Sequence, residues 1–337
     1  MTLEYNCMSA IKSNDSVIEL LKNANGYLSG EAIAQRLSIS RAAVWKKIEK
    51  LRAQGFSIEA QPKLGYRILS LPDKLLPLEI KDGLDTAVFG QRLFYYSTIS
   101  STNLIAKQLA SEGAAEGSVV IAEEQTKGRG RLDREWISPA GKNILMSVVF
   151  YPKLPPSHVF SLTMMTSLAI VKAIETTVAV FPMIKWPNDI YLHGKKIGGI
   201  LTEFNAQQDM VNFVIAGIGL NVNFDLFNYP EIKDIGTSLL KESGKEISRI
   251  KLLQSILKEI EKGYRLINDG KFDRIYNQWN RYSLVTGKPV RIISFNSVED
   301  GIAESVDETG ALVLRDKHGN VKKIVCGDVS LRLNLSD

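Results

Sequence analysis

The chain has 337 residues, of which 45% are hydrophobic and 23% charged, and its formal net charge is +5. These values are ordinary for a soluble globular protein, and at ~150 residues per domain the length predicts two or three domains. No run of about 18 apolar residues occurs, which argues against a transmembrane helix and a membrane partner.

The cysteine content argues against two classes of small domain. Cys7 and Cys326 are the only cysteines, and their spacing fits neither a disulfide scaffold nor a zinc site. Such sparse use of cysteine fits a reducing compartment. Residues 1–7 are too polar for a secretory signal, so we expect a cytoplasmic protein.

The positive charge is concentrated near the N-terminus. Residues 1–70 hold ten basic and six acidic side chains, which is +4 of the total of +5. A basic small domain joined to a nearly neutral large one indicates a polyanionic partner for the small domain.

Residues 1–70 carry the pattern of a winged helix-turn-helix domain. Apolar residues at helical spacing, with Asp15 and Ser29 as candidate caps, predict three short helices at 15–24, 30–38 and 41–55. Two short apolar segments, 56–60 and 65–70, follow and predict a β-hairpin. In such domains the third helix enters the major groove of DNA.

The third predicted helix has one apolar stripe and a basic remainder. Basic side chains away from this stripe, together with one in the wing, are the candidate DNA contacts: Arg41, Lys46, Lys47, Lys50 and Lys63. The alternative is a small helical interaction module whose lysines are only solvated. The charge excess and the hairpin favour DNA binding.

The rest of the chain divides into a linker at 71–90, an α+β domain with a mixed sheet at 91–285 and a β domain at 286–337. Prolines and glycine at 71–90 predict a linker with one short helix. Strand-like and helical segments alternate over 91–285, with hairpin spacing among the later strands. The short strands after residue 286 predict a small barrel of SH3-like size. The fold class is therefore α+β and multidomain.

The segment Gly128-Arg129-Gly130-Arg131, extended by Arg134 and Trp136, is the first candidate for chemistry. Glycines let the backbone approach an anion closely, and arginines supply fixed charges suited to carboxylate and phosphate oxygens. A flexible basic loop is the alternative. Its place directly after an apolar strand argues against a disordered tail.

Two further segments can contribute polar groups. Pro187 interrupts strand pairing in Lys185-Trp186-Pro187-Asn188-Asp189, which predicts a bend that presents Asn188 and Asp189, and an acid there can hold the Mg²⁺ that accompanies ATP. Lys195-Lys196 precedes a strand with Gly198-Gly199, where a lysine can point at a ligand lying over the glycines. A structural corner and a turn with solvated lysines are the respective alternatives.

In this order, the motifs resemble those of the bifunctional biotin protein ligases that also repress the biotin operon. The resemblance rests on Ser101-Thr102-Asn103, Gln125, GRGR with Arg134 and Trp136, KWPND at 185–189, Lys196 with IGGIL, and GIGLNVN at 217–223. Residues 29–55 and 63–68 match the repressor domain, and 311–316 and 326–332 match the C-terminal domain. One departure is Leu132-Asp133, where some members have Arg-Gly.

The resemblance implies a two-step ligase. Biotin and ATP give biotinyl-5′-AMP and pyrophosphate, and the biotinyl group then passes to a lysine of a biotin carboxyl carrier protein. Neither step needs an enzyme nucleophile, which agrees with the scattered positions of His158, His193 and His318. Catalysis then depends on positioning and on neutralisation of charge.

The resemblance also implies roles for individual residues. Lys196 and Arg131 are expected to be catalytic. Biotin is expected to contact Ser101, Thr102, Asn103, Gln125, Arg129, Gly130, Arg131 and Lys196. ATP is expected to contact Arg131, Arg134, Trp136, Asn188, Asp189 and Asn221, with Mg²⁺ at Asp189.

The family's regulation implies three further partners. The adenylate is expected to act as corepressor and to favour a homodimer that binds operator DNA. The carrier protein would compete for the same monomer. Two alternatives stay open: a biotin-sensing repressor without ligase activity, and a lipoate-type protein ligase.

Overall fold

The structure is a computed structural model that describes residues 17–53, 55–70, 73–207, 209–294, 297–325 and 327–331. The predicted cap Asp15 and both cysteines lie outside these residues. The chain forms two compact units, Met1–Lys74 and Leu75–Asp337, which are described separately.

The N-terminal unit has the predicted order of helices followed by a hairpin. Residues 17–22 are helical, and α2 (Gly30–Leu37), α3 (Arg41–Ala53), β1 (Ser57–Gln61) and β2 (Gly65–Ser70) follow. Ser29 caps α2 by accepting a hydrogen bond from the Ala32 amide at 3.1 Å. The strands β1 and β2 pair antiparallel and form the wing.

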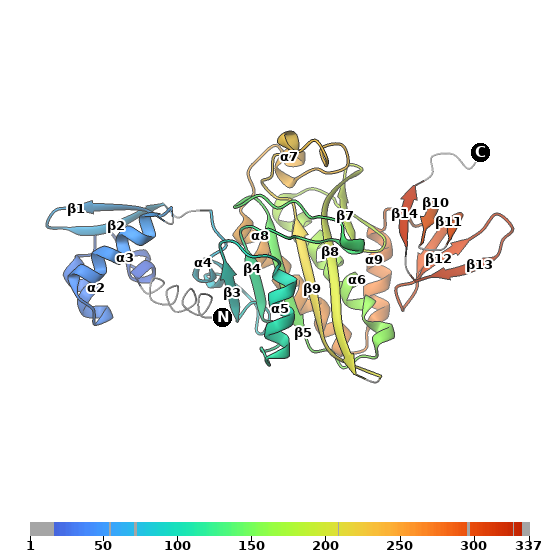
Figure 1. Ribbon diagram of the computed structural model, residues 1–337, viewed down its shortest axis with the longest axis horizontal. Helices are drawn as coiled ribbons and strands as arrows, with labels where there is room; N and C mark the ends of the chain where they lie inside the picture. Colours follow the sequence, from blue (N-terminus) through green and yellow to red (C-terminus); the bar gives the residue numbers. More distant parts are fainter. Residues whose placement is uncertain are drawn as a thin grey trace. The chain divides into compact units, whose positions relative to one another are not determined.

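A seven-stranded mixed sheet is the centre of the second unit (Figure 1). Its strand order is β3-β4-β5-β9-β8-β7-β6, and only β3 and β4 are parallel to each other. The strands are β3 (Leu93–Tyr96), β4 (Val119–Ala122), β5 (Ile144–Phe150), β6 (Met183–Lys185), β7 (Asp189–Leu192), β8 (Lys195–Gln207) and β9 (Met210–Leu220). The predicted mixed sheet with antiparallel later strands is confirmed.

Alternate residues of the central strands pack on opposite faces of the sheet, as the two-residue repeat of a strand requires. Val120 of β4 and Val149 of β5 pack with Ala106 of α5 (Thr102–Ser111). Their neighbours Val119 and Val148 belong to the larger cluster formed with α6 (Phe160–Val178) and α8 (Arg249–Asn268). The remaining helices are α4 (Pro77–Lys81), α7 (Leu239–Ser243) and α9 (Phe272–Tyr282).

Helix α6 is the core helix of this unit. Residues Pro156–Val178 are long and apolar enough to cross a membrane, and they are the single such segment in the described part of the chain. However, 78% of the apolar window is buried inside the protein. The apolar surface of the helix is therefore used for packing under the sheet.

A buried ion pair holds the beginning of this unit against the sheet. Arg249, at the start of α8, is 0% exposed and donates to Glu123 Oε2 at 2.8 Å. The other carboxylate oxygen of Glu123 accepts from the Leu75 amide at 2.7 Å. Glu123, which directly follows β4 and lies two residues before Gln125, is thus held from two directions.

Five antiparallel strands form the C-terminal domain. They are β10 (Lys288–Ile293), β11 (Val298–Val306), β12 (Leu312–Arg315), β13 (Val321–Ile324) and β14 (Asp328–Leu331), in the order β13-β12-β11-β10-β14. The predicted small β domain is confirmed. Within the described residues the edge strands β13 and β14 do not pair with each other, so the predicted closure into a barrel is not confirmed.

Candidate active site

A cavity of about 430 Å³ opens where the N-terminus of α5, the loop after β4 and strands β7, β8 and β9 meet. It is lined by every residue that the sequence predicts for the ligands: Ser101, Thr102, Asn103, Gln125, Arg129, Gly130, Arg131, Arg134, Trp136, Asn188, Asp189, Lys196 and Asn221. None of the three histidines lines it. The fold therefore brings together segments more than 100 residues apart in the chain.

The N-terminus of α5 builds one end of the cavity. The Thr102 amide and hydroxyl donate to Gln125 Oε1 at 2.7 and 3.0 Å. The buried Asn103 amide lies over Gly217 and accepts from the Ser147 hydroxyl at 2.6 Å. This end is uncharged, polar and well connected by hydrogen bonds.

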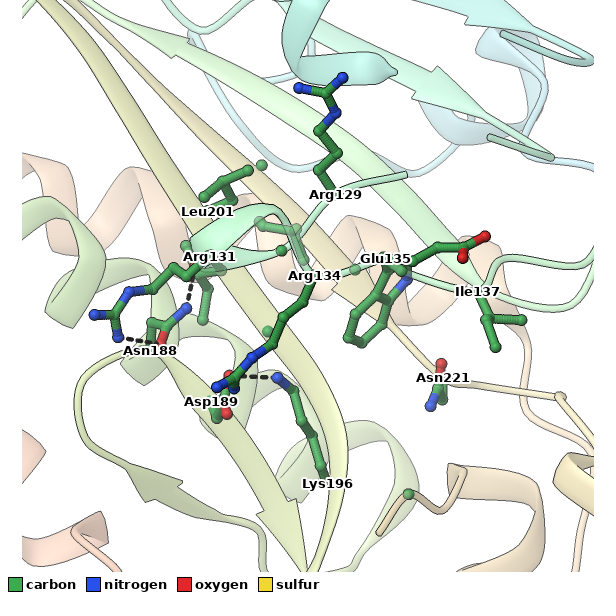
Figure 2. Close-up of a pocket in the computed structure, with 18 of the residues that line it drawn as sticks. Arg129, Arg131, Arg134, Glu135, Ile137, Asn188, Asp189, Lys196, Leu201 and Asn221 are labelled. Atoms are coloured by element: carbon green, nitrogen blue, oxygen red, sulfur yellow. Dashed lines mark hydrogen bonds and ion pairs between the residues drawn. The ribbon is translucent and has the colours of Figure 1, made fainter. Parts of the chain in front are cut away.

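The arginine loop folds back on itself beside the cavity (Figure 2). The Gly130 amide donates to the Arg134 carbonyl at 2.7 Å, and the Trp136 amide donates to the Gly128 carbonyl at 3.0 Å. Between them Leu132 has φ 55° and is 75% exposed. The sequence departure at Leu132-Asp133 thus falls at the tip of the loop.

The arginines of this loop have different surroundings. Arg131 donates to Asn188 Oδ1 at 3.3 Å, and Arg134 forms an ion pair with Asp328 at the start of β14. Arg129 is exposed, and its guanidinium group extends away from Arg131 and Asn188 in Figure 2. Two arginine side chains are thus close to the polar groups of β7 and β14, while Arg129 contributes to the rim.

The segment between β6 and β7 bends as predicted. The Trp186–Pro187 peptide is cis, and Trp186 is buried with its Nε1 donating to the Gly310 carbonyl at 3.0 Å. Asn188 Nδ2 donates to the Ile200 carbonyl at 2.7 Å, which fixes its amide beside Arg131. Asp189 begins β7 opposite Gly199 of β8, and its side chain reaches Lys196 at the start of β8.

Lys196 and Asp189 form an ion pair at the centre of the site, with 2.7 Å between Nζ and Oδ1. Lys196 Nζ also lies 5.6 Å from the centre of the Trp136 ring. Nearby, burial lowers the pKa of Lys185 and raises the pKa of Tyr191.

Charge in the cavity is mostly positive. Five basic side chains and three acidic ones line it: Arg129, Arg131, Arg134, Lys185 and Lys196, against Glu135, Asp189 and Asp328. An excess of positive charge in a partly enclosed space favours an anionic ligand.

Two buried polar atoms of this site have no hydrogen-bond partner among the described residues. They are Trp136 Nε1 and Asn221 Oδ1. Buried donors and acceptors in folded proteins are nearly always paired, so two orphans on residues that line one cavity point to a partner that the described residues do not supply. Asn221 itself is held in place, since its Nδ2 donates to the Thr237 carbonyl at 3.1 Å.

Sequence reasoning missed several functional neighbours. Gly217 and Gly219, Ser147, Lys185 and Asp328 were not singled out as site residues, although most of them belong to the cavity or its hydrogen-bond network. The alternating glycines of GIGLNVN were the available signal. No sequence signal marked Asp328 as a site residue, because its position next to Arg134 depends on how the C-terminal strands pack.

The predicted DNA contacts lie in the N-terminal unit. Arg41, Lys46, Lys50 and Lys63 are exposed, and Lys47 is half-buried. Burial, together with the charge of Lys50, lowers the pKa of Lys47. The three exposed cations of α3 lie away from its buried stripe of Val44, Ile48 and Leu51.

Three family models match separate parts of the chain. The Biotin/lipoate A/B protein ligase family matches residues 95–223, an HTH domain matches residues 15–67, and the Biotin protein ligase C terminal domain matches residues 285–332. The Bifunctional ligase/repressor BirA of Bacillus spizizenii is 43% identical over 317 residues, which cover 94% of this chain and 97% of that protein. The chain belongs to the bifunctional biotin ligase/repressor family.

A more distant bifunctional relative and a solved biotin protein ligase are also similar to this chain. The Bifunctional ligase/repressor BirA of Escherichia coli is 29% identical and covers 94% of this chain and 96% of its own length. The solved biotin protein ligase of Aquifex aeolicus in complex with biotin and ATP superposes with a TM-score of 0.62 at 28% identity, over 72% of this chain and 99% of that one. The helix-turn-helix match lies in the first unit, and the two ligase matches lie in the second.

Proposed function

We propose that this bifunctional biotin ligase/repressor joins biotin to a lysine of a carrier protein in two steps. A biotin carboxylate oxygen attacks the α-phosphorus of ATP, and the bond from that phosphorus to pyrophosphate breaks. The lysine amine of the carrier then attacks the carbonyl carbon of biotinyl-5′-AMP, loses a proton and releases AMP. The observation that carries the proposal is the basic cavity with two orphaned polar atoms, Trp136 Nε1 and Asn221 Oδ1.

The two reactants repel each other, because both are anions. Lys196 and Arg131 are placed to offset this repulsion, since both are basic side chains that line the cavity. We propose that Lys196 contacts the reacting carboxylate and α-phosphate, and that Arg131 holds the phosphate from the loop.

We propose that the uncharged end of the cavity holds the ring system of biotin. A urea group needs both donors and acceptors, and this end supplies them. The proposed biotin contacts are Ser101, Thr102, Asn103, Gln125, Arg129, Gly130, Arg131 and Lys196. Asn103 is 6% exposed and its amide is already paired within the protein, so its contribution is to hold the others.

The nucleotide is proposed to lie near the orphaned atoms. Trp136 would contact the adenine and Asn221 the nucleotide, with Arg134, Asn188 and Asp189 toward the phosphates. Displacement of Arg134 from Asp328 would free its guanidinium for a phosphate.

Mg²⁺ would arrive with ATP, and Asp189 is the proposed ligand. The described residues contain no group of three or more His, Cys, Asp and Glu side chains able to hold a metal ion by themselves. A magnesium ion bound to phosphate oxygens needs only one or two protein carboxylates, and the single Asp189 fits that requirement. When bound, it would neutralise negative charge on the triphosphate.

We propose that the N-terminal unit binds operator DNA through Arg41, Lys46, Lys47, Lys50 and Lys63. The corepressor would be biotinyl-5′-AMP, which would favour a homodimer and thereby present two winged helices to a two-fold operator. Binding to the carrier protein would compete with dimerisation. The cytoplasm is the compartment where biotin, ATP and operator DNA meet.

We propose four segments: 1–70 for the DNA-binding domain, 71–90 for the linker, 91–285 for the catalytic domain and 286–337 for the C-terminal domain. For the last, an SH3-like barrel remains the proposal, supported by five short antiparallel strands in about 50 residues.

The experiment is a streptavidin blot of a biotin carrier domain incubated with the protein, biotin and ATP. Labelling that requires both small molecules is expected. No labelling, despite biotin binding, would instead support a biotin-sensing repressor without ligase activity. Labelling by lipoate and not by biotin, detected with a lipoyl antibody, would support a lipoate-type ligase.

A further inference from the structure

The amide of Asn103 bridges three neighbouring strands above a glycine. Ser147 of β5, Gly217 of β9 and Leu201 of β8 are directly in register. A Cβ at Gly217 would lie 2.1 Å from Asn103 Oδ1, so the amide fills the space of the missing side chain. The Asn103 side chain is therefore enclosed between β5 and β8.

Glu203 determines which way round this amide lies. Glu203 Oε2 accepts from Asn103 Nδ2 at 2.7 Å, and the Leu201 carbonyl accepts from the same nitrogen at 3.2 Å. Because a carboxylate and a carbonyl can only accept, the nitrogen of Asn103 must face β8. Its oxygen then faces β5, where it accepts from Ser147 at 2.6 Å.

Lys107 holds Glu203 in this position. It follows Asn103 by one turn of α5, and its Nζ lies 2.9 Å from Glu203 Oε1. The two side chains are 43% and 33% exposed, so the attraction between them is screened and contributes little by itself. By contrast, the hydrogen bond from Asn103 to Glu203 involves a buried side chain, since Asn103 is 6% exposed.

The position of Asn103 is passed on to the cavity through the first turn of α5, because Thr102 is its neighbour in the chain. Ser147 Oγ lies 2.8 Å from Thr102 Oγ1. Ser147 has one hydroxyl hydrogen, which it gives to Asn103, so the Thr102 amide is the donor that commits Gln125 Oε1, at 2.7 Å. With its oxygen committed, Gln125 has only Nε2 left to offer, and in the described residues that nitrogen has no hydrogen-bond partner.

We infer that Glu203 is a positioning residue for biotin: it fixes Asn103 and with it the first turn of α5, so that the Thr102 amide keeps the Nε2 donor of Gln125 turned to the ligand. The inference rests on the proposed function, and Glu203 itself does not line the cavity. A donor at this point selects an acceptor, such as the urea carbonyl oxygen of biotin. It disfavours an analogue that carries a protonated imino group in place of that oxygen.

The test replaces Glu203 by methionine in the full-length chain, which removes the acceptor and keeps the length of the side chain. Dissociation constants for biotin, for the imino analogue and for ATP are measured separately by calorimetry. We expect the constant for biotin to rise about tenfold, because a buried amide loses its fixed partner. The constant for ATP is expected to change less than about twofold, and the preference for biotin over the imino analogue to fall about tenfold.

Three further variants separate positioning from a general loss of structure. Glu203→Gln keeps an oxygen that can accept from Asn103 and is expected to restore most of the biotin affinity. Lys107→Met removes only the exposed ion pair and is expected to change biotin binding less than about threefold. Asp85→Asn is the matched control, since Asp85 is another carboxylate in an exposed ion pair with a lysine, and no change is expected.

An unchanged biotin constant in a folded Glu203→Met variant would overturn the inference, and so would an equal rise for biotin and ATP. If that variant loses its thermal unfolding transition, Ser147→Ala tests the same chain of hydrogen bonds, with a selective loss of biotin affinity expected. Unchanged biotin binding there also contradicts the inference. A wild-type protein that binds biotin but forms no adenylate would contradict the proposed function and leave this binding test intact.

Discussion

Two glycines of β9 make room for the side chains that form the floor of the cavity. Gly217 lies under the Asn103 amide, and a Cβ at Gly219 would come within 2.6 Å of the Trp136 indole. Both positions face the same side of the sheet, because strand residues two apart share a face. The lack of a side chain at these two glycines therefore leaves room for Asn103 and Trp136 beside the cavity.

Arg131 is the arginine of the loop that is best placed to act on both reactants. It lines the cavity, lies 3.3 Å from Asn188 Oδ1 and comes from the turn Arg131–Asp133. Arginine keeps its charge at any accessible pH and binds oxyanions through a planar fork. Its removal should therefore affect the transition state more than the fold.

We predict that Arg131→Ala lowers the rate of biotinyl-5′-AMP formation by about 100-fold, as expected for loss of a positioned cation beside the developing charge. Pyrophosphate release measures the rate. DNA binding by the variant in the absence of biotin and ATP should be unchanged, because Arg131 lies outside the unit that holds the winged helix.

The matched control is Arg274→Ala, an exposed arginine of α9 outside the cavity, for which we expect an unchanged rate. A normal turnover in Arg131→Ala would count against the assignment of the arginine loop to the reaction.

At the scale of elements, the arginine loop contacts the C-terminal sheet. Arg134 pairs with Asp328 at the start of β14, and Arg131 Nη2 lies 3.5 Å from the Gly327 carbonyl. Trp186 of the β6–β7 turn also donates to Gly310 in the turn before β12. The C-terminal domain thus forms part of the wall of the cavity and is more than an appended module.

A second contact between elements ties α8 to the segment before β3. The Glu261 carboxylate accepts hydrogen bonds from the amides of Ala87, Val88 and Phe89 at 2.9–3.1 Å. Burial by itself would raise the pKa of Glu261, but the three amides, assisted by Arg265, outweigh it and lower the pKa below its usual value.

We predict that Glu261→Gln lowers the free energy of unfolding at pH 7 by about 1 kcal/mol, since a charged acceptor is replaced by a neutral one. The pKa is lower in the folded protein than in the unfolded chain, so the ionised carboxylate stabilises the fold above pH ~4.3, its unfolded value. This contribution is lost as the pH falls through the folded pKa. Urea unfolding at pH 7 and at progressively lower pH measures the effect. The free energies of unfolding of the wild-type protein and Glu261→Gln should become equal as the pH falls.

Glu259→Gln on the same helix is the control, because the ion-pair partner of Glu259 among the described residues is the exposed Lys262. A similar loss of stability in both variants at pH 7, or a difference that does not shrink in acid, would contradict the role of the three amides.

For the whole molecule, the important feature is the division into two units with separate chemistry. The basic helix α3 lies in the first unit, and every residue of the cavity lies in the second. A ligand in the cavity can therefore influence DNA binding only through a change in the second unit or in its assembly. Dimerisation on adenylate binding would meet this requirement.

We predict that the affinity of the full-length protein for operator DNA rises when biotin and ATP are both present, because the adenylate favours the dimer. A gel shift with and without the two small molecules measures it, and Arg131→Ala should not respond to them. Equal DNA binding with and without the two small molecules would contradict regulation by the adenylate. It would not bear on the ligase activity.

Much of this architecture could be predicted from the sequence. The periodicity of residues 30–55 and the Ser29 cap predicted α2 and α3 correctly, and Pro187 marked the bend before Asn188 and Asp189. Local signals were sufficient there because capping, helical periodicity and proline geometry act within a few residues. Barrel closure at the C-terminus was not confirmed, because the pairing of edge strands depends on distant segments.

The sequence alone determined the family, the order of the domains and the chemical groups available for binding, since these follow from local patterns and ordered motifs. Only the tertiary structure decided which of these groups meet. It placed Glu203 against Asn103, Asp328 against Arg134, and the Gly217 backbone under a side chain of helix α5. The physical reason is that the orientation of an amide or the partner of an arginine depends on strand register and packing, which join residues far apart in the chain.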